Sequence, residues 1–509
     1  MLAELIILPP FLAAVVIGLG MLAGHIEGEA HERFTSRITL LAATISLFAV
    51  LGAIVMKRNG TLSDTVILGT WLECGDYRIE LGFGFDGLNL TLAVLVALIS
   101  VMVLRFSVNY MHRETGFHRF FMVLSLFVGA MLLLVLGGNA ALTFAGWELA
   151  GVASYVLIAY AYDRPVAAAN ATRAFVTNRI GDAGFVLGIF LAFAWTGGID
   201  WPHIAVRSAQ LAQWQAGVLA GCFLFAAIAK SAQVPLAPWL ARAMEGPTPS
   251  SAIFYGAVMV HAGVYLVLRL QPVFEQAPLA MALMAAIGLT TALYGFVCGL
   301  TQTDVKSALI FSTSGQIGLM FLEAGLGWWN LALWHLCSHA VFRVYQFLTA
   351  PSLMHQIVGS PNRSVPARVA QQRWLYVASL QRFWLENLGD WLVVKPLQRL
   401  GSDLSLFDHQ VVHSAAGLPV GSSIEEGSER EPGSADPDVI RVSGLAGRCI
   451  AIMANLLHWF EDRLVLKGVG EELLLAGRRL GVRLNRFEAL LNEPRYLIVF
   501  IIASLLTVL

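Results

Sequence analysis

Charged residues and clustered cysteines are both scarce in this sequence. Only 13% of the 509 residues are Asp, Glu, Lys or Arg, about half the share in an average soluble domain. The five cysteines are scattered and form no CxxC pair, whereas zinc sites and iron–sulfur clusters need clustered ligands. We therefore expect no metal, no redox cofactor and no electron transfer on this chain.

Other familiar signals are missing as well. The net charge of −1 offers no basic surface for nucleic acid. The Gly-rich piece GFGFDG lacks the strand–turn–helix setting of a dinucleotide site. The N-terminus, MLAELIILPPFLAAVVIGLG, has no basic start and carries Glu4. We therefore expect a retained first membrane helix rather than a cleaved signal peptide.

Apolar residues, by contrast, make up 57% of the sequence. Before residue 351 they gather into eleven runs, each close to the roughly 20 residues that cross a bilayer as a helix. The runs are 3–23, 37–56, 87–108, 119–137, 139–161, 173–194, 217–243, 250–271, 278–300, 305–325 and 330–350. The sequence therefore predicts an all-α polytopic membrane protein of about 11–12 transmembrane helices.

The chain divides into segments of different character. Residues 1–86 hold two spans and a loop whose β-like stretches, Val66–Leu68 and Tyr77–Leu81, predict an external hairpin. Residues 87–350 hold the remaining nine runs. Beyond them we expect an amphipathic segment at 351–416, a disordered linker at 417–438, an amphipathic helix at 439–495 and a terminal membrane anchor at 496–509.

The distribution of Lys and Arg predicts the orientation in the membrane. With the N-terminus outside, the inside loops hold Arg33, Arg37, Arg113, Arg119, Arg164, Arg173 and Lys306, and the outside loops hold Lys57, Arg58, Arg78 and Arg207. Cytoplasmic loops carry the excess of Lys and Arg. We therefore expect the Arg-rich tail on the cytoplasmic side of a bacterial inner membrane.

Ionisable side chains occur inside several predicted spans. They are Glu148, Arg179, Asp182, Lys230, Glu323, His335, His339 and Arg343. A charge at the bilayer centre costs about 2.5–3.5 kcal/mol on insertion scales, so such residues pair with one another or serve transport. Arg179 and Asp182 are three residues apart on one helical face and can form a structural ion pair. His335, His339 and Arg343 follow at i, i+4 and i+8 and form one stripe.

Lys230 stands beside a predicted break in its helix. Pro235 and Pro238 follow it, and proline removes a backbone donor and clashes with the preceding turn. Broken membrane helices expose carbonyls that can hold a cation or water. Together with Glu and His, a buried Lys is typical of a proton relay.

Several long motifs resemble one known family. They are GWELAGVASYVLIAY, NRIGDAGF, KSAQVPLAPWLARAMEGPTPSSAI, MVHAGVYLVLR, LTQTDVKSALIFSTSGQIG and HLCSHAVFR. In this order they are similar to the antiporter-like subunits of respiratory complex I, over residues 80–350. The tail motifs FEDRLVLKGV and LLLAGRRLGVRLNRFEALL resemble the lateral helix of the distal subunit, which would make 439–495 that helix and 87–350 the proton-conducting core.

The resemblance implies roles for individual residues. Glu148 would tune a lysine across the subunit, and Lys230 would be that lysine on the broken helix. Arg179 and Asp182 would be the charged pair beside it. The central proton path would run through His335 and His339.

The sequence departs from the family pattern in three places. Arg343 stands where the family usually has a lysine, and arginine is effectively always protonated. Tyr255 stands where a histidine is common, and His261 follows six residues on, about 120° away on a regular helix. The second inverted repeat stops after Arg343, without its own broken helix.

The sequence leaves four functions open. The chain could be a proton-translocating subunit of a complex I-like assembly, with other subunits as partners. It could be the membrane partner of an inorganic carbon transporter, acting with a large soluble zinc-binding protein. It could be a cation/proton antiporter subunit, or a scaffold that no longer conducts. The motif GWELAG and the tail favour the first, and the short second repeat favours the second.

Overall fold

The computed structural model describes residues 2–74, 77–356 and 365–391, with positions 395, 396, 400 and 404 after them. The chain divides into two compact units, and the described residues up to Asp390 belong to the first. Their regular structure is helical apart from one antiparallel hairpin. Within this part, nine helices are long and apolar enough to cross a membrane, which confirms the predicted all-α polytopic fold.

Two membrane helices and the predicted hairpin come first. They are α1 (Leu2–Leu22), α2 (Glu32–Arg58), β1 (Thr65–Cys74) and β2 (Tyr77–Gly84). The two strands pair antiparallel, with Thr65 opposite Gly84. The side-chain amide of Asn139 donates to the carbonyl of Glu80 at 2.8 Å, which ties β2 to the bundle.

Helix α4 (Phe117–Leu136) is largely buried, with 89% of its apolar stretch inside the bundle. Its neighbours in sequence are α3 (Gly87–Tyr110), α5 (Ala140–Ile158), α6 (Pro165–Thr196) and α7 (Trp201–Ser208). A side chain at Gly146 would lie 2.7 Å from the Ala130 carbonyl oxygen. Glycine there lets α5 pack directly against the backbone of α4.

The predicted helix break follows α8 (Gln213–Lys230). The chain leaves the helix after Lys230 and resumes in the short helix α9 (Pro238–Arg242). The indole N–H of Trp239 donates to the carbonyl of Ala229 at 3.0 Å. A carbonyl near the end of α8 is thus satisfied within the protein, as a buried helix end requires.

A second irregular stretch lies in the predicted span 250–271. It contains α10 (Thr248–Ser251), a π-helical turn over Ala252–Ala257, a 3₁₀ turn over Met259–His261, α11 (Ala262–Arg269) and α12 (Gln271–Glu275). The sequence predicted a regular helix here because the stretch from Ala252 to Arg269 contains no proline. Single π-helical turns are frequent at functional sites.

Three long helices complete the bundle: α13 (Pro278–Gly299), α14 (Val305–Gly325) and α15 (Trp329–Gln356). Glycines set the contact between α13 and α14, since a side chain at Gly288 would lie 2.5 Å from the Gly318 carbonyl oxygen. Helices α8 and α15 occupy the other two predicted spans and are not among the nine apolar ones.

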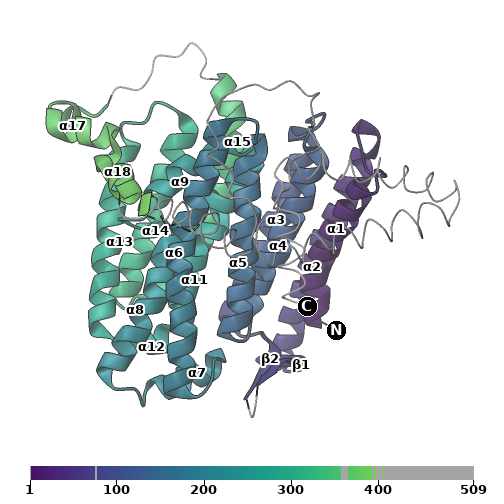
Figure 1. Ribbon diagram of the computed structural model, residues 1–509, viewed down its shortest axis with the longest axis vertical. Coiled ribbons are helices and arrows are strands. Elements are labelled where there is room, and N and C mark those ends of the chain that lie inside the picture. The colour runs from purple at the N-terminus through teal and green to yellow at the C-terminus, as the bar shows by residue number, and fades with distance from the viewer. Residues whose placement is uncertain are drawn as a thin grey trace, which may run out of the picture. The chain divides into compact units, whose positions relative to one another are not determined.

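Figure 1 shows the long helices side by side, with the hairpin, α7 and α12 at one end of the bundle. We call this the hairpin end. Helices α16 (Ala367–Ala370), α17 (Arg373–Leu380) and α18 (Leu385–Gly389) follow α15, and α17 and α18 lie at the opposite end, the α18 end. Because α14 runs toward the hairpin end and α15 returns from it, the residues on either side of their connection lie there.

Ion pairs hold α18 to the bundle. Glu386 contacts Arg242 and Arg382, each at 2.5 Å, and Arg173 reaches Asp390 at 2.8 Å. The predicted segment 351–416 is described only in part. The predicted linker 417–438, lateral helix 439–495 and anchor 496–509 lie outside the described residues.

The Glu386 contact makes the docking of α18 sensitive to acid. Burial raises the pKa of the Glu386 carboxyl, but the hydrogen bond from Arg242 and the charge of Arg382 outweigh it and hold the pKa below its usual value of 4.5. Because the pKa of Glu386 is lower in the docked state, its carboxylate stabilises the docking of α18 fully above the usual carboxyl pKa of 4.5. This stabilisation is lost as the pH falls from 4.5 through the lowered pKa of Glu386. We expect amide hydrogen exchange in Leu385–Gly389 to become faster below about pH 4.5. In the Glu386→Gln variant the exchange should already be faster than in the native chain at neutral pH. Unchanged protection down to about pH 3 would contradict this.

Candidate functional site

Lys230 is the first centre of the candidate site. The side chain is 1% exposed and stands at the end of α8. Its Nζ donates to the backbone carbonyl of Trp147 at 2.9 Å and lies 5.0 Å from the centroid of the Trp147 ring. A carbonyl and an aromatic face therefore solvate the ammonium group where water is excluded.

Three further charged residues surround Lys230. Arg179 is ion-paired with Glu148, and its Nη2 lies 3.0 Å from Asp182. The charged groups that act on Lys230 itself are Asp182 and Arg179. Two cations and two anions thus share one site, in which Lys230 and Asp182 are buried and Glu148 and Arg179 are partly exposed. We call it the lysine cluster: Glu148, Arg179, Asp182, Lys230 and Trp147. The predicted Arg179–Asp182 pair is present, and Arg179 is also the partner of Glu148.

The sequence analysis missed Trp147. Its indole N–H donates to Asp182 at 2.6 Å while its carbonyl accepts from Lys230. One residue therefore orients the acid and the base of the cluster. The only signal in the sequence was its position directly before Glu148 in GWELAG.

The second centre is a pair of histidines. Nε2 of His261 lies 2.9 Å from Nδ1 of His339, and Nε of Arg343 donates to Nε2 of His339 at 3.3 Å. With Arg343 donating to Nε2, a neutral His339 carries its proton on Nδ1 and donates it to His261. His261 then carries its own proton on Nδ1, which is buried and has no partner among the described residues.

The position of His261 corrects the expected geometry. We placed His261 about 120° from Tyr255 on a regular helix, but the π-helical and 3₁₀ turns lie between them. The 100° rotation per residue does not apply across such turns. Tyr255 is fully buried against Trp239, and in the described part of the chain its hydroxyl has no hydrogen-bond partner.

His335 continues the histidine row one turn earlier on α15. Its Nδ1 lies 2.9 Å from Glu323, and its Nε2 lies 2.8 Å from Oε1 of Gln316. A glutamine amide can present either its oxygen or its NH₂ group. The same contact therefore serves a neutral and a protonated His335. The His335 and His339 rings meet edge-on with centroids 6.2 Å apart.

A row of polar side chains lies between α14 and α15. Arg343 donates to Ser312 and to Gln346, each at 2.9 Å. We call the row the polar seam; it consists of Ser312, Gln316 and Glu323 on α14 and His335, His339, Arg343 and Gln346 on α15. The four-residue spacing from Ser312 to Gln316 was visible in the sequence, but its alignment with α15 was not.

A hydrogen bond joins the two segments that carry these centres. Ser231, next to Lys230, donates through its hydroxyl to the carbonyl of Val260 at 2.7 Å, and Val260 precedes His261. A side chain at Gly263 would clash with the Ala227 carbonyl and the Ser231 hydroxyl, so α8 and α11 touch here. The lysine cluster and the histidine pair are thus linked through adjacent residues.

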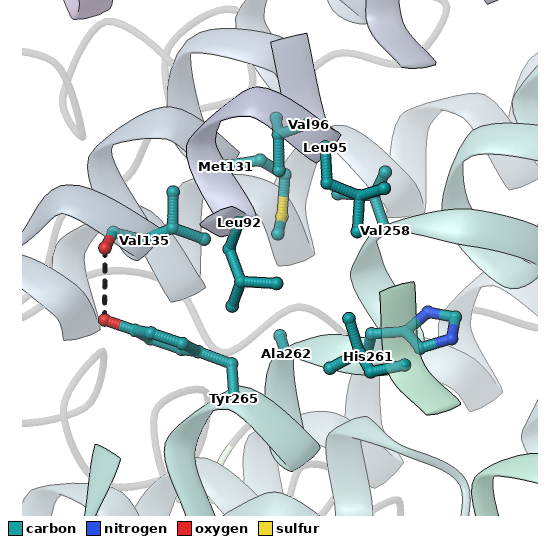
Figure 2. Close-up of a pocket in the computed structure, with 10 residues that line it drawn as sticks. Leu92, Leu95, Val96, Met131, Val135, Val258, His261, Ala262 and Tyr265 are labelled. Carbon is teal, nitrogen blue, oxygen red and sulfur yellow. Dashed lines mark hydrogen bonds between the residues drawn. The ribbon is translucent and has the colours of Figure 1, made fainter. Parts of the chain in front are cut away.

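An apolar cavity lies on the other side of His261. Its volume is about 20 Å³ and Leu92, Met131, Val258 and Tyr265 are among its lining residues. Figure 2 shows the His261 ring turned away from Tyr265, whose hydroxyl donates to the Val135 carbonyl at 3.2 Å. The volume would admit one water, but apolar cavities of this kind stay dry. The cavity therefore insulates the histidine pair from Tyr265.

Metal ligands do not gather in the described ranges. No group of three or more His, Cys, Asp or Glu there could hold a metal ion. Glu, Lys and His side chains of the kinds found in both centres can bind and release protons.

Comparison with known proteins identifies the family. The family described as "NADH:quinone oxidoreductase/Mrp antiporter, TM" matches residues 137–365, and "NADH-Ubiquinone oxidoreductase (complex I), chain 5 N-terminus" matches residues 71–121. This chain belongs to the antiporter-like subunit family of complex I. Both centres of the candidate site lie within residues 137–365, and the predicted resemblance is confirmed.

Curated relatives agree with this family. The chain is 38% identical over 352 residues to NAD(P)H-quinone oxidoreductase subunit 5, chloroplastic, of Nephroselmis olivacea, covering 68% of this chain and 54% of the relative. It is 37% identical over 364 residues to NAD(P)H-quinone oxidoreductase chain 5 of Synechocystis sp., covering 70% and 53%. The chain thus spans about half the length of the curated relatives it matches.

Solved structures share the fold. The Mrp complex from Dietzia sp. is similar with a TM-score of 0.62 and 26% identity, over 70% of this chain and 38% of that chain. The membrane-bound sulfane sulfur reductase, an archaeal respiratory membrane complex, has a TM-score of 0.58 at 19% identity, over 68% and 70%. The second likeness concerns the fold alone.

The packing around Lys230 leads to a stability prediction. A methyl group at Gly151 would lie 3.0 Å from Nη2 of Arg179 and 3.2 Å from Nζ of Lys230, whereas one at Gly221 would meet nothing within 4 Å. We expect Gly151→Ala to destabilise the protein by about 1–3 kcal/mol through overpacking and Gly221→Ala to be neutral or stabilising. Thermal unfolding in detergent compares the two. Equal melting temperatures would show that the cluster has room for a methyl group.

Proposed function

We propose that this chain conducts protons as a membrane subunit of a complex I-like NAD(P)H–quinone oxidoreductase assembly. One observation carries the proposal: two buried hydrogen-bonded centres, Lys230 with Trp147 and His261 with His339, lie next to each other in the bundle. A hydrogen bond between Ser231 and Val260, the chain neighbours of Lys230 and His261, holds the two segments together. Buried ionisable residues in a membrane are costly and persist where they serve transport. The relatives are named as subunits of NAD(P)H-quinone oxidoreductases, and this supports the proposal that the chain belongs to such an assembly.

The redox reaction would belong to other subunits, which are the partners we propose. The chain would lie in a bacterial inner membrane with its tail on the cytoplasmic side, as the distribution of Lys and Arg favours. Protons would pass between Lys230 and His339, with Glu148, Arg179 and Asp182 setting the charge around the lysine. Arg343 would hold His339 in one tautomer rather than carry a proton, because arginine stays protonated.

A cation/proton antiporter subunit is the second candidate. The likeness to the Mrp complex favours it. The two functions differ in the ion moved. Sodium-dependent proton flux in proteoliposomes would support the antiporter, and flux independent of sodium would support the first proposal.

An inorganic carbon transporter would instead need a soluble zinc-binding partner that co-purifies with the chain.

Removal of the buried amine tests the proposed path. Lys230→Met keeps the length of the side chain and removes its charge. We expect proton flux, measured as collapse of a pH gradient in proteoliposomes that hold the chain with its co-purifying partners, to fall at least about tenfold. Lys306→Met, at the start of α14, is the matched control and should leave the flux unchanged. Normal flux in both variants would remove Lys230 from the path, and an intact assembly without flux would favour the scaffold.

The histidine pair offers a second test. His261 and His339 share one hydrogen bond, and residues that act as a unit show non-additive losses. We expect His261→Gln, His339→Gln and the double variant to lose about the same share of the proton flux. A double variant whose loss is the product of the two single losses would mean that the histidines act independently.

A further inference from the structure

Glu323 stands at the end of the polar seam nearest the hairpin end. It is three residues before the start of the connection between α14 and α15, since α14 ends at Gly325. His335 lies in the second turn of α15, and its Nδ1 is 2.9 Å from the Glu323 carboxylate. The proposed path thus continues past the histidine pair to a carboxylate close to one end of the bundle.

Exposure changes along this row. His261 and His339 are buried at 3% and 7% exposed. The side chains of His335 and Glu323 retain 19% and 14% of their exposure. The His335–Glu323 pair, at the hairpin end of the seam, is thus more exposed than the histidine pair.

The other direction from His261 is lined by apolar side chains. From His261 toward Tyr265 the chain offers the apolar cavity (Figure 2), whose lining gives water few hydrogen-bond partners. The seam instead offers acceptors and donors at each step, with Gln316 beside His335 and Arg343 beside His339. Charge and polarity therefore favour the seam over the cavity.

We propose that Glu323 exchanges protons with the compartment at the hairpin end and passes them to and from His335. The inference rests on the proposed function and deepens it. An inward step moves one proton from the Glu323 carboxyl to Nδ1 of His335, which leaves a carboxylate and an imidazolium. The imidazolium then turns its ring and gives its Nε2 proton to Nε2 of His339, in place of the hydrogen bond from Arg343. His339 in turn passes its Nδ1 proton to Nε2 of His261, so that one proton enters and one positive charge moves along the row. The route gives the described part of the chain an opening at the hairpin end.

The first test is independent of flux. A hydrophobic carbodiimide modifies protonated carboxyl groups, and mass spectrometry locates the product. With the chain and its partners in proteoliposomes of known orientation, the pH of each compartment is set separately. We expect modification of Glu323 to rise at least about threefold when the pH of the hairpin-side compartment alone is lowered from about 8 to about 6. A response to the opposite compartment alone, or to neither, overturns the proposal.

The second test measures flux in variants. Glu323→Gln removes the proton carrier and keeps the size of the side chain, and we expect a loss of at least about tenfold, with partial recovery in Glu323→Asp. Glu275→Gln is the matched control, because Glu275 is also near the hairpin end but bonds only Gln271 among the described residues. Full flux in Glu323→Gln overturns the proposal even when Lys230→Met abolishes flux. If the native assembly does not conduct while Glu323 still responds to the hairpin-side pH, the exchange site stands and the proposed function fails.

Discussion

The hydrogen bond from Lys230 to the carbonyl of Trp147 is the interaction on which the rest of the site depends. It places an ammonium group at the end of a broken helix, where neither water nor lipid would hold it. The same tryptophan fixes Asp182 through its indole N–H, so the acid side of the cluster is oriented by the residue that binds the base. Arg179 then brings Glu148 into the group, and the four charges balance.

Close helix contacts carry this arrangement to the histidines. Gly151 leaves space on α5 for the charged groups of Arg179 and Lys230. Gly263 allows α11 to contact the end of α8. Because small residues allow backbones to approach where no hydrophobic force drives association, these two positions decide how near the charged groups come. The break after Lys230 would otherwise separate the lysine cluster from His261.

Much of this could be predicted from the sequence. Spans, hairpin and helix break follow from apolar length, alternation and proline, and Arg179–Asp182 and the stripe on α15 follow from helical spacing. The partners of those residues could not be predicted, because Trp147 acts through its carbonyl and His261 meets His339 only by way of an irregular helix. Gln316 and Gln346 resemble ordinary surface residues until α14 and α15 are placed side by side.

The π-helical turn over Ala252–Ala257 has a consequence for how such a chain can evolve. A π-helical turn is equivalent to one extra residue in an α-helix, and it sets the direction of every side chain after it. Loss of a single residue there would turn His261 by about 100° away from His339 without changing either histidine. A deletion of three nucleotides in this turn would thus separate the histidine pair while both histidines stay in the sequence.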